Sequence, residues 1–371
     1  MRIAVTGAAG FLGQHLRVAL RAGGEHECIP IDRGVFGDPE QLEAALTGAG
    51  AVVHLAGVNR DRQEVIEQAN VDLAERLARA LSRLPDPPKG VVYANSAQAG
   101  NDTPYGRGKR RAAEILAAWA DKAASALVDM RLCNVFGERS RPFYNTVVGT
   151  FCHQLAVGET PKVLEDRTIS LVHAQDAAAR IIGELGDLEA SREVVTSGHP
   201  LAVSDLLVRL EGMHGVYTNH HGRFPNLSDT FDVDLFNTYR SYLFPSGYPR
   251  PLRSNRDPRG NFVELDQSAG GEAQTSFSTT VPGVTRGEHY HLRKIERFVV
   301  LSGEATIGIR PVLSDRVTTY RVSGDEPVFV DMPTLCAHNI TNVGDRVLYT
   351  AFWTNEIFDP DHPDTYREPV G

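Results

Sequence analysis

Cysteine is scarce in this sequence, and long apolar runs are missing. Only four of the 371 residues are cysteines, and they form neither a CxxC pair nor a disulfide-like spacing: Cys28, Cys133, Cys152 and Cys336. Isolated cysteines of this kind are typical of buried thiols in a reducing compartment. No apolar stretch approaches the roughly 18–20 residues that a membrane span requires, and the first thirteen residues carry three glycines and no A-x-A cleavage site. We therefore expect a cytoplasmic protein that does not bind a membrane.

An excess of positive charge is also missing. Lys and Arg number 38 against 47 Asp and Glu, which gives a formal net charge of -9 and an isoelectric point near 5.8. This balance argues against a nucleic-acid partner, which normally requires a clustered basic face. Apolar residues make up 42% and charged residues 23% of the chain, so it lies outside the disordered class and can bury a core. The length predicts about two domains.

Two different patterns divide the chain. Up to about residue 200, β-branched runs (2–6, 51–55, 91–93, 126–130) alternate with Ala/Leu/Arg-rich segments such as 72–84 and 110–122. Strands that alternate with helices predict βαβ units around a parallel sheet. From about residue 251, β-rich pieces separated by Pro-Gly, Asn and Asp predict an all-β sandwich or barrel. The proline-rich stretch 224–251 resembles a connector, and we predict domains at 1–248 and 249–371.

A glycine pattern follows the first predicted strand and opens an amphipathic helix. Such glycines allow a tight turn, so that a dinucleotide pyrophosphate can approach backbone amides and the positive end of the helix. Asp32, at the end of the second strand, is placed to hold a ribose hydroxyl, and Arg33 is of the type that pairs with a 2′-phosphate. The sequence therefore predicts a Rossmann site that favours NADPH over NADH, with these binding residues: Gly7, Gly10, Phe11, Leu12, Gly13, Asp32 and Arg33.

Tyr105 and Lys109 form a second pattern, with Ser96 nine residues upstream of the tyrosine. At positions i and i+4 of one helix, the phenol and the ammonium share a face. Lys109 can then lower the pKa of the phenol and contact the cofactor ribose, while Ser96 holds the substrate oxygen. We predict that these three residues are catalytic. A second Tyr-x-x-x-Lys string, Tyr290 to Lys294, lies inside another motif, and we interpret it as accidental.

The third pattern is a set of metal-ligand residues. His289 and His291 are two apart on a predicted strand, so both imidazoles point to the same face. Glu296 and His338 would complete a site of three nitrogens and one carboxylate, with positions left for water or substrate. We predict one divalent metal at these four residues. The residues alone leave open whether it is zinc, iron, nickel or manganese, and whether it is catalytic or structural.

With these motifs, the N-terminal part resembles the extended short-chain dehydrogenase/reductase superfamily that acts on nucleotide sugars. The resemblance includes further stretches: His54-Leu-Ala-Gly57, Asn70, Arg131-Leu-Cys-Asn134-Val-Phe-Gly137 and Ser170-Leu-Val-His173. It implies that Leu55, Ala56 and Gly57 line the cofactor. Members that dehydrate at C4/C6 carry an acidic residue just after the catalytic Ser/Thr, whereas Ser96 is followed by Ala-Gln-Ala. A reductase or an epimerase therefore fits better than a dehydratase.

The C-terminal ligand set is similar in spacing to the two cupin motifs, although Leu335 stands where a cupin usually has glycine. Cupins are double-sheet jelly rolls, which agrees with the strand pattern. A Rossmann reductase followed by a cupin resembles, over the whole chain, the bifunctional reductase/epimerases of capsular polysaccharide synthesis, which form UDP-2-acetamido-2,6-dideoxy-L-talose. The resemblance implies that the cupin epimerises C3 of a UDP-4-keto-6-deoxy-N-acetylhexosamine, that NADPH then reduces C4, that zinc occupies the cupin, and that the protein is a homodimer.

The residues do not decide every part of this function. Metal-bound histidines cannot carry the proton at C3, so Lys294 is our candidate for that role, with Tyr290 and Arg286 as alternatives. A plain NADPH-dependent 4-keto-sugar-nucleotide reductase with a structural or dimerising cupin remains an alternative, as does a non-catalytic nucleotide-sensing protein. The sequence does not distinguish UDP from dTDP, or an N-acetyl group from a hydroxyl.

Overall fold

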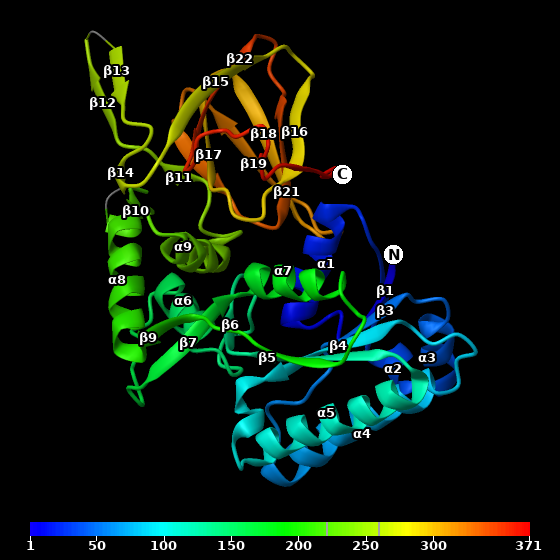
Figure 1. The fold of residues 1–371 in the computed structure, drawn as a ribbon. Helices are drawn as coiled ribbons and strands as arrows, with labels where there is room; N and C mark the ends of the chain where they lie inside the picture. Colours follow the sequence, from blue (N-terminus) through cyan, green and yellow to red (C-terminus); the bar gives the residue numbers. More distant parts are fainter. Residues whose placement is uncertain (220–221, 259) are drawn as a thin grey trace. The chain divides into compact units, whose positions relative to one another are not determined.

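Alternating strands and helices in the first part of the chain form a six-stranded parallel sheet (Figure 1). The structure is a computed structural model that describes residues 1–219, 222–258 and 260–371. By its contacts the chain forms two units: the first contains Met1–Phe136, Ser140–Thr146 and Thr168–Leu201, and the second contains Gly137–Arg139, Val147–Arg167 and Ala202–Gly371.

The sheet of the first unit has the order β2-β1-β3-β4-β5-β8. Its strands are β1 (Arg2–Thr6), β2 (Glu27–Ile31), β3 (Ala51–His54), β4 (Gly90–Ser96), β5 (Ala126–Leu132) and β8 (Arg192–Val195). The order changes direction between β1 and β3, and this switch point is where doubly wound sheets bind ligands. A smaller sheet contains β6 (Asn134–Phe136), β7 (Thr168–His173) and β9 (His199–Ala202). The predicted parallel α/β fold is confirmed.

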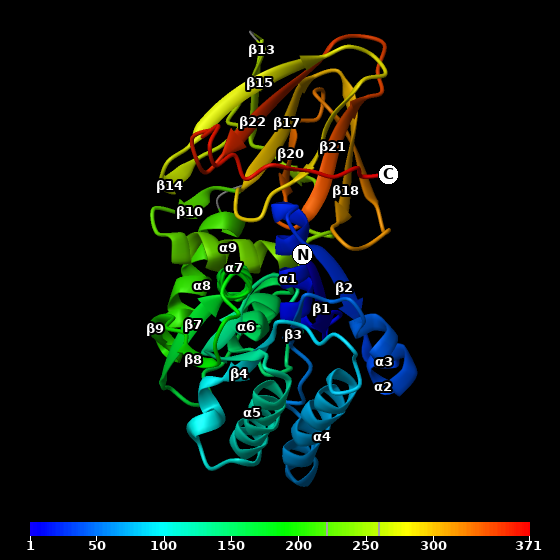
Figure 2. The same ribbon diagram turned by 45° about the vertical axis from the view of Figure 1, so that its right-hand side comes forward.

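Helices cover both faces of this parallel sheet, which explains why its central strands are almost uniformly apolar. On one face, α3 (Pro39–Leu46), α4 (Gln63–Leu81) and α5 (Pro104–Ala123) enclose one buried apolar cluster, and α4 and α5 lie side by side (Figures 1 and 2). On the other face, α1 (Phe11–Gly23) and α7 (Ala174–Glu184) enclose a second cluster. Two short elements, α2 (Arg33–Gly37) and η1 (Ala97–Gly100), follow β2 and β4.

Two five-stranded antiparallel sheets form the centre of the second unit, as the predicted cupin-like fold requires. One sheet contains β11 (Arg250–Pro251), β20 (Val328–Met332), β17 (Glu296–Ser302), β22 (Leu348–Thr354) and β15 (Gln274–Thr280), in that order. The other contains β19 (Thr318–Ser323), β18 (Glu304–Pro311), β21 (Cys336–Asn342), β16 (Thr285–Tyr290) and β23 (Tyr366–Arg367). The unit also contains the short strand pair β10 (Phe224–Asn226) and β14 (Ser268–Gly270), and the pair β12 (Ser254–Asp257) and β13 (Gly260–Val263).

Helices α6 (Val147–Ala156), α8 (Val203–Asn219) and α9 (Thr230–Leu243) belong to this second unit. On α9, the buried Arg240 donates to the carbonyl of Met332 at 2.6 Å. These helices precede residue 248 in the sequence, and the predicted division at 248/249 stays a prediction. In the described part of the chain, no helix has both the length and the apolar character needed to cross a membrane.

A buried ion pair joins β17, β20 and α8. Arg297 and Asp331 are directly opposite each other on β17 and β20, and two N–H groups of Arg297 donate to the Asp331 carboxylate at 2.6 and 3.0 Å. The Tyr217 hydroxyl of α8 donates to the same carboxylate at 2.6 Å. The Arg297 guanidinium also lies 4.1 Å from the ring centroid of Phe224 and 3.8 Å from that of Phe329. Burial works to raise the pKa of Asp331, but Arg297 outweighs it and holds that pKa below its ordinary value.

Asp331→Ala should destabilise the second unit by roughly 3–5 kcal/mol, because it leaves the Arg297 charge buried without its partner. Tyr217→Phe removes one hydrogen bond and should cost about 1–2 kcal/mol. Urea unfolding followed by the fluorescence of Trp353, in a Trp119→Phe background, measures this because Trp353 is then the only tryptophan and stacks on Phe224 at 3.9 Å. Glu75→Ala, at the exposed Glu75–Arg79 pair, is the control and should change little. An Asp331→Ala protein as stable as that control would contradict the prediction.

Candidate functional site

The glycine turn after β1 forms a site that is open to a phosphate. Gly7 has a φ of +68°, and a Cβ there would lie 2.8 Å from the backbone nitrogen of Ala56. A Cβ on Gly13 would lie 2.3 Å from the Gly7 carbonyl oxygen, so both positions require glycine. Helix α1 begins at Phe11, and its N-cap, Gly10, has no side chain that could bind the first amides. These amides and the positive end of the helix fit a pyrophosphate.

The other predicted cofactor residues follow the carboxyl ends of β2 and β3, next to the switch point. Leu55 and Ala56 are half-buried and Gly57 is exposed. Asp32 and Arg33 are exposed, and the Asp32 carboxylate accepts the amide of Val35 at 2.9 Å, which caps α2. The structure thus brings the residues at the ends of the first three strands to the edge of the sheet where a dinucleotide binds in Rossmann folds. The cradle fits a nicotinamide dinucleotide.

The three predicted catalytic residues lie on two elements: Ser96 at the end of β4, and Tyr105 and Lys109 in the first turns of α5. Ser96 is the last residue of β4, and its hydroxyl forms a hydrogen bond with the Tyr105 phenol. Helix α5 begins at Pro104 because the side chain of Thr103 caps its first turn, accepting the Gly106 amide at 3.1 Å. This cap places the phenol in the first turn and the ammonium one turn later.

Burial tunes the two titratable groups of this set. It raises the pKa of the Tyr105 phenol, which the hydrogen bond with Ser96 opposes. It lowers the pKa of the Lys109 ammonium to about 7, and the carboxylate of Asp129 opposes that shift only in part. The ammonium donates to the carbonyl oxygen of Ala94 at 2.7 Å and lies 4.1 Å from the ring centroid of Tyr93. Tyr105 is therefore a protonated donor, and Lys109 is a cation that releases its proton easily.

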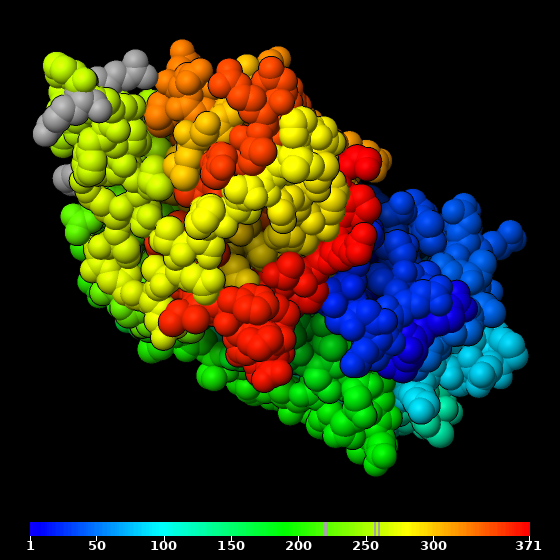
Figure 3. Space-filling view, turned by 90° about the horizontal axis from the view of Figure 1, so that it is seen from above, coloured from blue at the N-terminus to red at the C-terminus, as the bar shows by residue number. Residues whose placement is uncertain are grey.

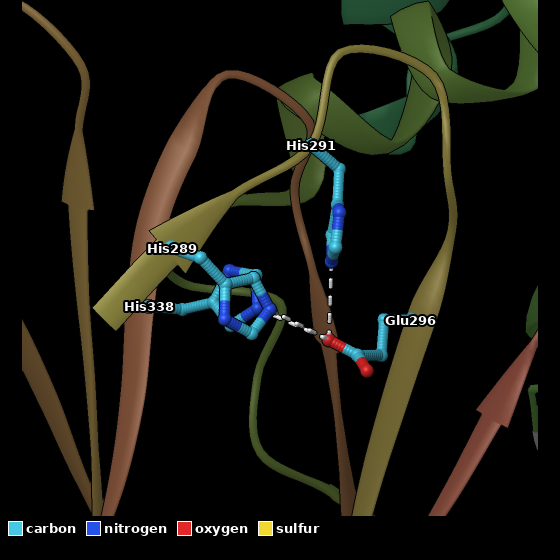
Figure 4. Close-up of side chains that lie close together, drawn as sticks. All are labelled: His289, His291, Glu296 and His338. Carbon is cyan, nitrogen blue, oxygen red and sulfur yellow. Dashed lines mark hydrogen bonds and ion pairs between the residues drawn. The ribbon is translucent and has the colours of Figure 1, made fainter. Parts of the chain in front are cut away.

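The four predicted metal-ligating side chains come together between the two antiparallel sheets of the second unit (Figure 4). Their donor atoms all lie within 4.8 Å of one another. The Nε2 atoms of the histidines lie 3.1 Å (His338), 3.3 Å (His291) and 3.8 Å (His289) from the Glu296 Oε2 oxygen. Three imidazole nitrogens and one carboxylate oxygen are ligands that suit zinc and other first-row divalent metals. The residues therefore fit a divalent ion.

The other ring nitrogens of two histidines are already bound, which leaves Nε2 to face the metal position. His291 Nδ1 donates to the carbonyl of Asp364 at 2.6 Å, and His338 Nδ1 donates to the carbonyl of Cys336 at 3.1 Å. Burial lowers the pKa of His338 to about 4, so its imidazole is neutral at pH 7, as a ligand must be. Burial works to raise the pKa of Glu296, but the three surrounding histidines outweigh it and hold that pKa well below its ordinary value.

Three of the four side chains, those of His289, His291 and Glu296, line one wall of a cavity of about 360 Å³. Strand register decides what else faces it: Gln274 and Thr354 stand beside Glu296 in one rung, and Ser276 and Phe352 stand beside Phe298 in the next. Figure 3 shows a hollow between the yellow atoms around β15 and β16 and the red atoms of the C-terminal stretch. The cavity therefore combines a metal site with polar and aromatic walls, as a small polar ligand requires.

Lys294 lines this cavity and is only 6% exposed. Its ammonium donates to the Pro363 carbonyl at 2.6 Å and lies 3.8 Å from a carboxylate oxygen of Glu356. Arg286 also lines the cavity and donates to the carbonyl of Thr279 at 3.0 Å. Tyr290 is buried and stacks on Tyr366 with ring centroids 5.3 Å apart. Of the three candidate proton carriers, Lys294 and Arg286 face the cavity.

Sequence reasoning missed several residues that support these sites. Asp364 orients His291 and also accepts the backbone amides of residues 292–294 through its carboxylate. Glu356 faces the cavity beside Lys294, and Tyr93 lies under Lys109. No spacing rule links them to the motifs, because each lies in a different segment of the chain.

Comparison with known proteins gives a consistent result over the whole chain. The NAD dependent epimerase/dehydratase family matches residues 3–183, and the polysaccharide biosynthesis C-terminal domain matches residues 255–366. The UDP-2-acetamido-2,6-beta-L-arabino-hexul-4-ose reductase of Pseudomonas aeruginosa is 33% identical over 100% of this chain and 99% of its own length. The spore coat polysaccharide biosynthesis protein SpsL of Bacillus subtilis is 27% identical over 32% of this chain and 85% of its own.

Among solved structures, the capsular polysaccharide assembling protein CapF of Staphylococcus aureus is 33% identical, with a TM-score of 0.64 and full coverage of both chains. Both proteins are more than 30% identical to this chain over its full length. This agrees with the predicted resemblance to enzymes that join a Rossmann reductase to a C-terminal cupin. The chain therefore belongs to the same two-domain family as the UDP-2-acetamido-2,6-beta-L-arabino-hexul-4-ose reductase of Pseudomonas aeruginosa and CapF of Staphylococcus aureus.

Proposed function

We propose that this protein is a bifunctional nucleotide-sugar enzyme. Its cupin part epimerises C3 of a UDP-4-keto-6-deoxy-N-acetylhexosamine, and its Rossmann part reduces the C4 ketone with NADPH, giving UDP-2-acetamido-2,6-dideoxy-L-talose. The observation that carries the proposal is that one chain holds two separate chemical sets: Ser96, Tyr105 and Lys109 in the first unit, and a three-histidine, one-carboxylate cluster facing a cavity in the second. Full-length similarity to a reductase of a UDP-2-acetamido-hexul-4-ose supports the substrate class.

In the reductase site, the chain's own residues bind the ketone and supply a proton. The raised pKa of Tyr105 keeps its phenol protonated, so it can donate to the oxygen of C4 as negative charge develops there. Ser96 hydrogen-bonds to the same phenol and can hold that oxygen in line. Lys109 lies one helical turn after Tyr105 in α5, and we assign it contact with the cofactor ribose and stabilisation of the charge left on Tyr105. A bound nicotinamide supplies the hydride.

The order of the two reactions follows from the chemistry of the sugar. The proton on C3 is acidic only while C4 is a ketone, because the carbanion is then an enolate. Epimerisation must therefore precede reduction, and reduction fixes the new configuration. In the cupin, we assign the proton transfer to Lys294, which faces the cavity, with Glu356 at 3.8 Å as its partner. A divalent ion held by His289, His291, Glu296 and His338 would stabilise negative charge on the substrate.

Several details belong to the same proposal. NADPH is favoured over NADH because the exposed Arg33 follows Asp32. Zinc is the proposed metal, since the four ligands match its preferences. We further propose a homodimer in the cytoplasm, with a Rossmann domain at 1–248 and a cupin domain at 249–371. The four cysteines, all free, fit a reducing compartment.

An NMR spectrum of the product formed in deuterated water tests both activities together. The substrate is UDP-2-acetamido-2,6-dideoxy-4-hexulose with NADPH. We expect deuterium at C3, an inverted C3 and a new hydroxyl at C4. A C4 alcohol that retains its C3 proton would favour the plain reductase, which is the activity named for the Pseudomonas relative. No reaction would contradict the substrate assignment.

Two substitutions should separate the activities. Tyr105→Phe removes the proton donor and should slow C4 reduction by about 10²–10⁴-fold while deuterium still enters C3. His338→Ala removes a metal ligand, and any product that it forms should carry no deuterium at C3. Tyr349→Phe, on the outer face of β22, is the matched control and should change neither activity. The same loss of both activities in Tyr105→Phe and His338→Ala would contradict two separate sites.

The rate of C4 reduction should fall as the pH rises. The pKa of Lys109 is lowered to about 7, below the ordinary lysine value, so the ammonium is present below that pH and is lost above it. If reduction needs the charge, kcat/KM for NADPH oxidation falls as the pH rises through about 7. Lys109→Arg keeps its charge throughout, so its profile should lack this fall whatever its absolute rate. A wild-type profile that stays flat to roughly pH 9 would rule out this role for the lysine.

A further inference from the structure

The tripeptide Gly137–Arg139 directly follows β6 in the sequence, yet it belongs to the second unit. The side chains of Glu138 and Arg139 both bind the segment 334–336, which precedes the metal ligand His338. The buried carboxylate of Glu138 accepts the hydroxyl of Thr334 at 2.6 Å. The guanidinium of Arg139 donates to the carbonyl of Leu335 at 2.5 Å and contacts the sulfur of Cys336 at 3.7 Å. A loop almost 200 residues away in the sequence is thus bound next to the metal cluster.

The segment 334–336 in turn holds two of the four ligands. The amide of Leu335 donates to the carbonyl of His291 at 2.8 Å. The carbonyl of Cys336 accepts Nδ1 of His338 at 3.1 Å, which fixes the ring with Nε2 toward Glu296. A shift of this segment would therefore move the main chain of one ligand and the ring of another.

Leu335 occupies a backbone conformation that needs external support. Its φ is +62°, in the left-handed region, where a non-glycine residue is strained. Such a residue persists only where its surroundings over-determine it. Here the carbonyl of Leu335 accepts both the amide of Val312 at 2.9 Å and Arg139, while its amide is bound to His291. Arg139 is the one side chain among these partners.

We propose that Arg139 is a positioning residue of the metal site. By holding Leu335 in its left-handed conformation, it keeps His291 and His338 in the orientation that binds the ion. The inference rests on the proposed metal binding by the four ligands. Coupling of this kind is reciprocal, so a bound ion also stabilises the loop Gly137–Arg139.

Zinc affinity of the full-length protein tests the proposal directly. Competition with a chromophoric zinc chelator gives the dissociation constant of the wild type, Arg139→Met, Arg139→Lys and Arg310→Met. Arg310 is the control, because it also donates to main-chain carbonyls of the second unit, those of residues 314, 369 and 370, but to none beside a ligand. It also pairs with the buried Glu368, so Arg310→Met tests whether destabilisation of the unit alone weakens zinc binding. We expect Arg139→Met to bind zinc about 10-fold more weakly or worse, Arg139→Lys to lie in between, and Arg310→Met to match the wild type.

Wild-type affinity in Arg139→Met would overturn the proposal, and so would an equal loss in Arg139→Met and Arg310→Met, which would show general destabilisation. Absence of zinc binding in the wild type would instead refute the proposed metal site itself, and the positioning role with it.

Hydrogen exchange of the wild-type protein gives a second readout that does not depend on a variant. Removal of zinc with a chelator should speed the exchange of the amides at Gly137–Arg139 and leave α4 (Gln63–Leu81) unchanged. This measurement decides the question if Arg139→Met does not fold. Exchange at the loop that is the same with and without zinc would overturn the coupling.

Discussion

The alternation of side chains along β17 is the constraint on which the second unit depends. Glu296 points to the inner face, where it meets three imidazoles, and Arg297, the next residue, points to the outer face, where it pairs with Asp331. Because the side-chain period of a strand is two, a slip of one residue would exchange these faces. It would place a guanidinium in the metal cluster and a carboxylate opposite Asp331. The register of β17 with β20 and β22 therefore fixes the metal site and the anchoring of α8 together.

The outer face of that sheet explains why helices α8 and α9 belong with an all-β fold. The Arg297 guanidinium is buried between the rings of Phe224 and Phe329, and its counter-charge is shared with the hydroxyl of Tyr217 on α8. A buried charge of this kind is tolerated only when its partner and its hydrogen bonds are complete. The helix that supplies the hydroxyl is thereby bound to the sheet, along with α9, through Arg240 and Met332.

Burial adjusts the protonation states in both candidate sites, and in each it favours the neutral form. In the first unit it raises the pKa of the Tyr105 phenol, which stays protonated, and it lowers the pKa of the Lys109 ammonium. In the second it keeps the His338 imidazole neutral, while three imidazoles keep the Glu296 carboxylate ionised. The protonated phenol, the neutral imidazole and the ionised carboxylate are the forms that proton donation and metal ligation require. The same physical cause, loss of water around an ionisable group, thus serves two kinds of chemistry.

The sequence by itself determined the features that depend on local spacing. The β-branched runs predicted the parallel sheet, because strands covered on both faces must be apolar throughout. The glycines of the first turn predicted the open helix end, and the spacings Tyr105 to Lys109 and His289 to His291 placed side chains on one face of a helix or strand. All four predicted metal ligands lie together, because alternating strands bring such residues into one layer.

Only the tertiary structure decided the residues that act from a distance. Arg139 and Leu335 are 196 residues apart, and Asp364 orients His291 from 73 residues away. No periodicity connects such pairs, since they meet only after both sheets have formed. The pKa shifts of Lys109 and His338 also depend on burial, which is a property of the folded chain and not of any motif. The grouping of α8 and α9 with the antiparallel sheets follows from the side-chain contacts of Arg297, Asp331, Tyr217 and Arg240, which sequence order conceals.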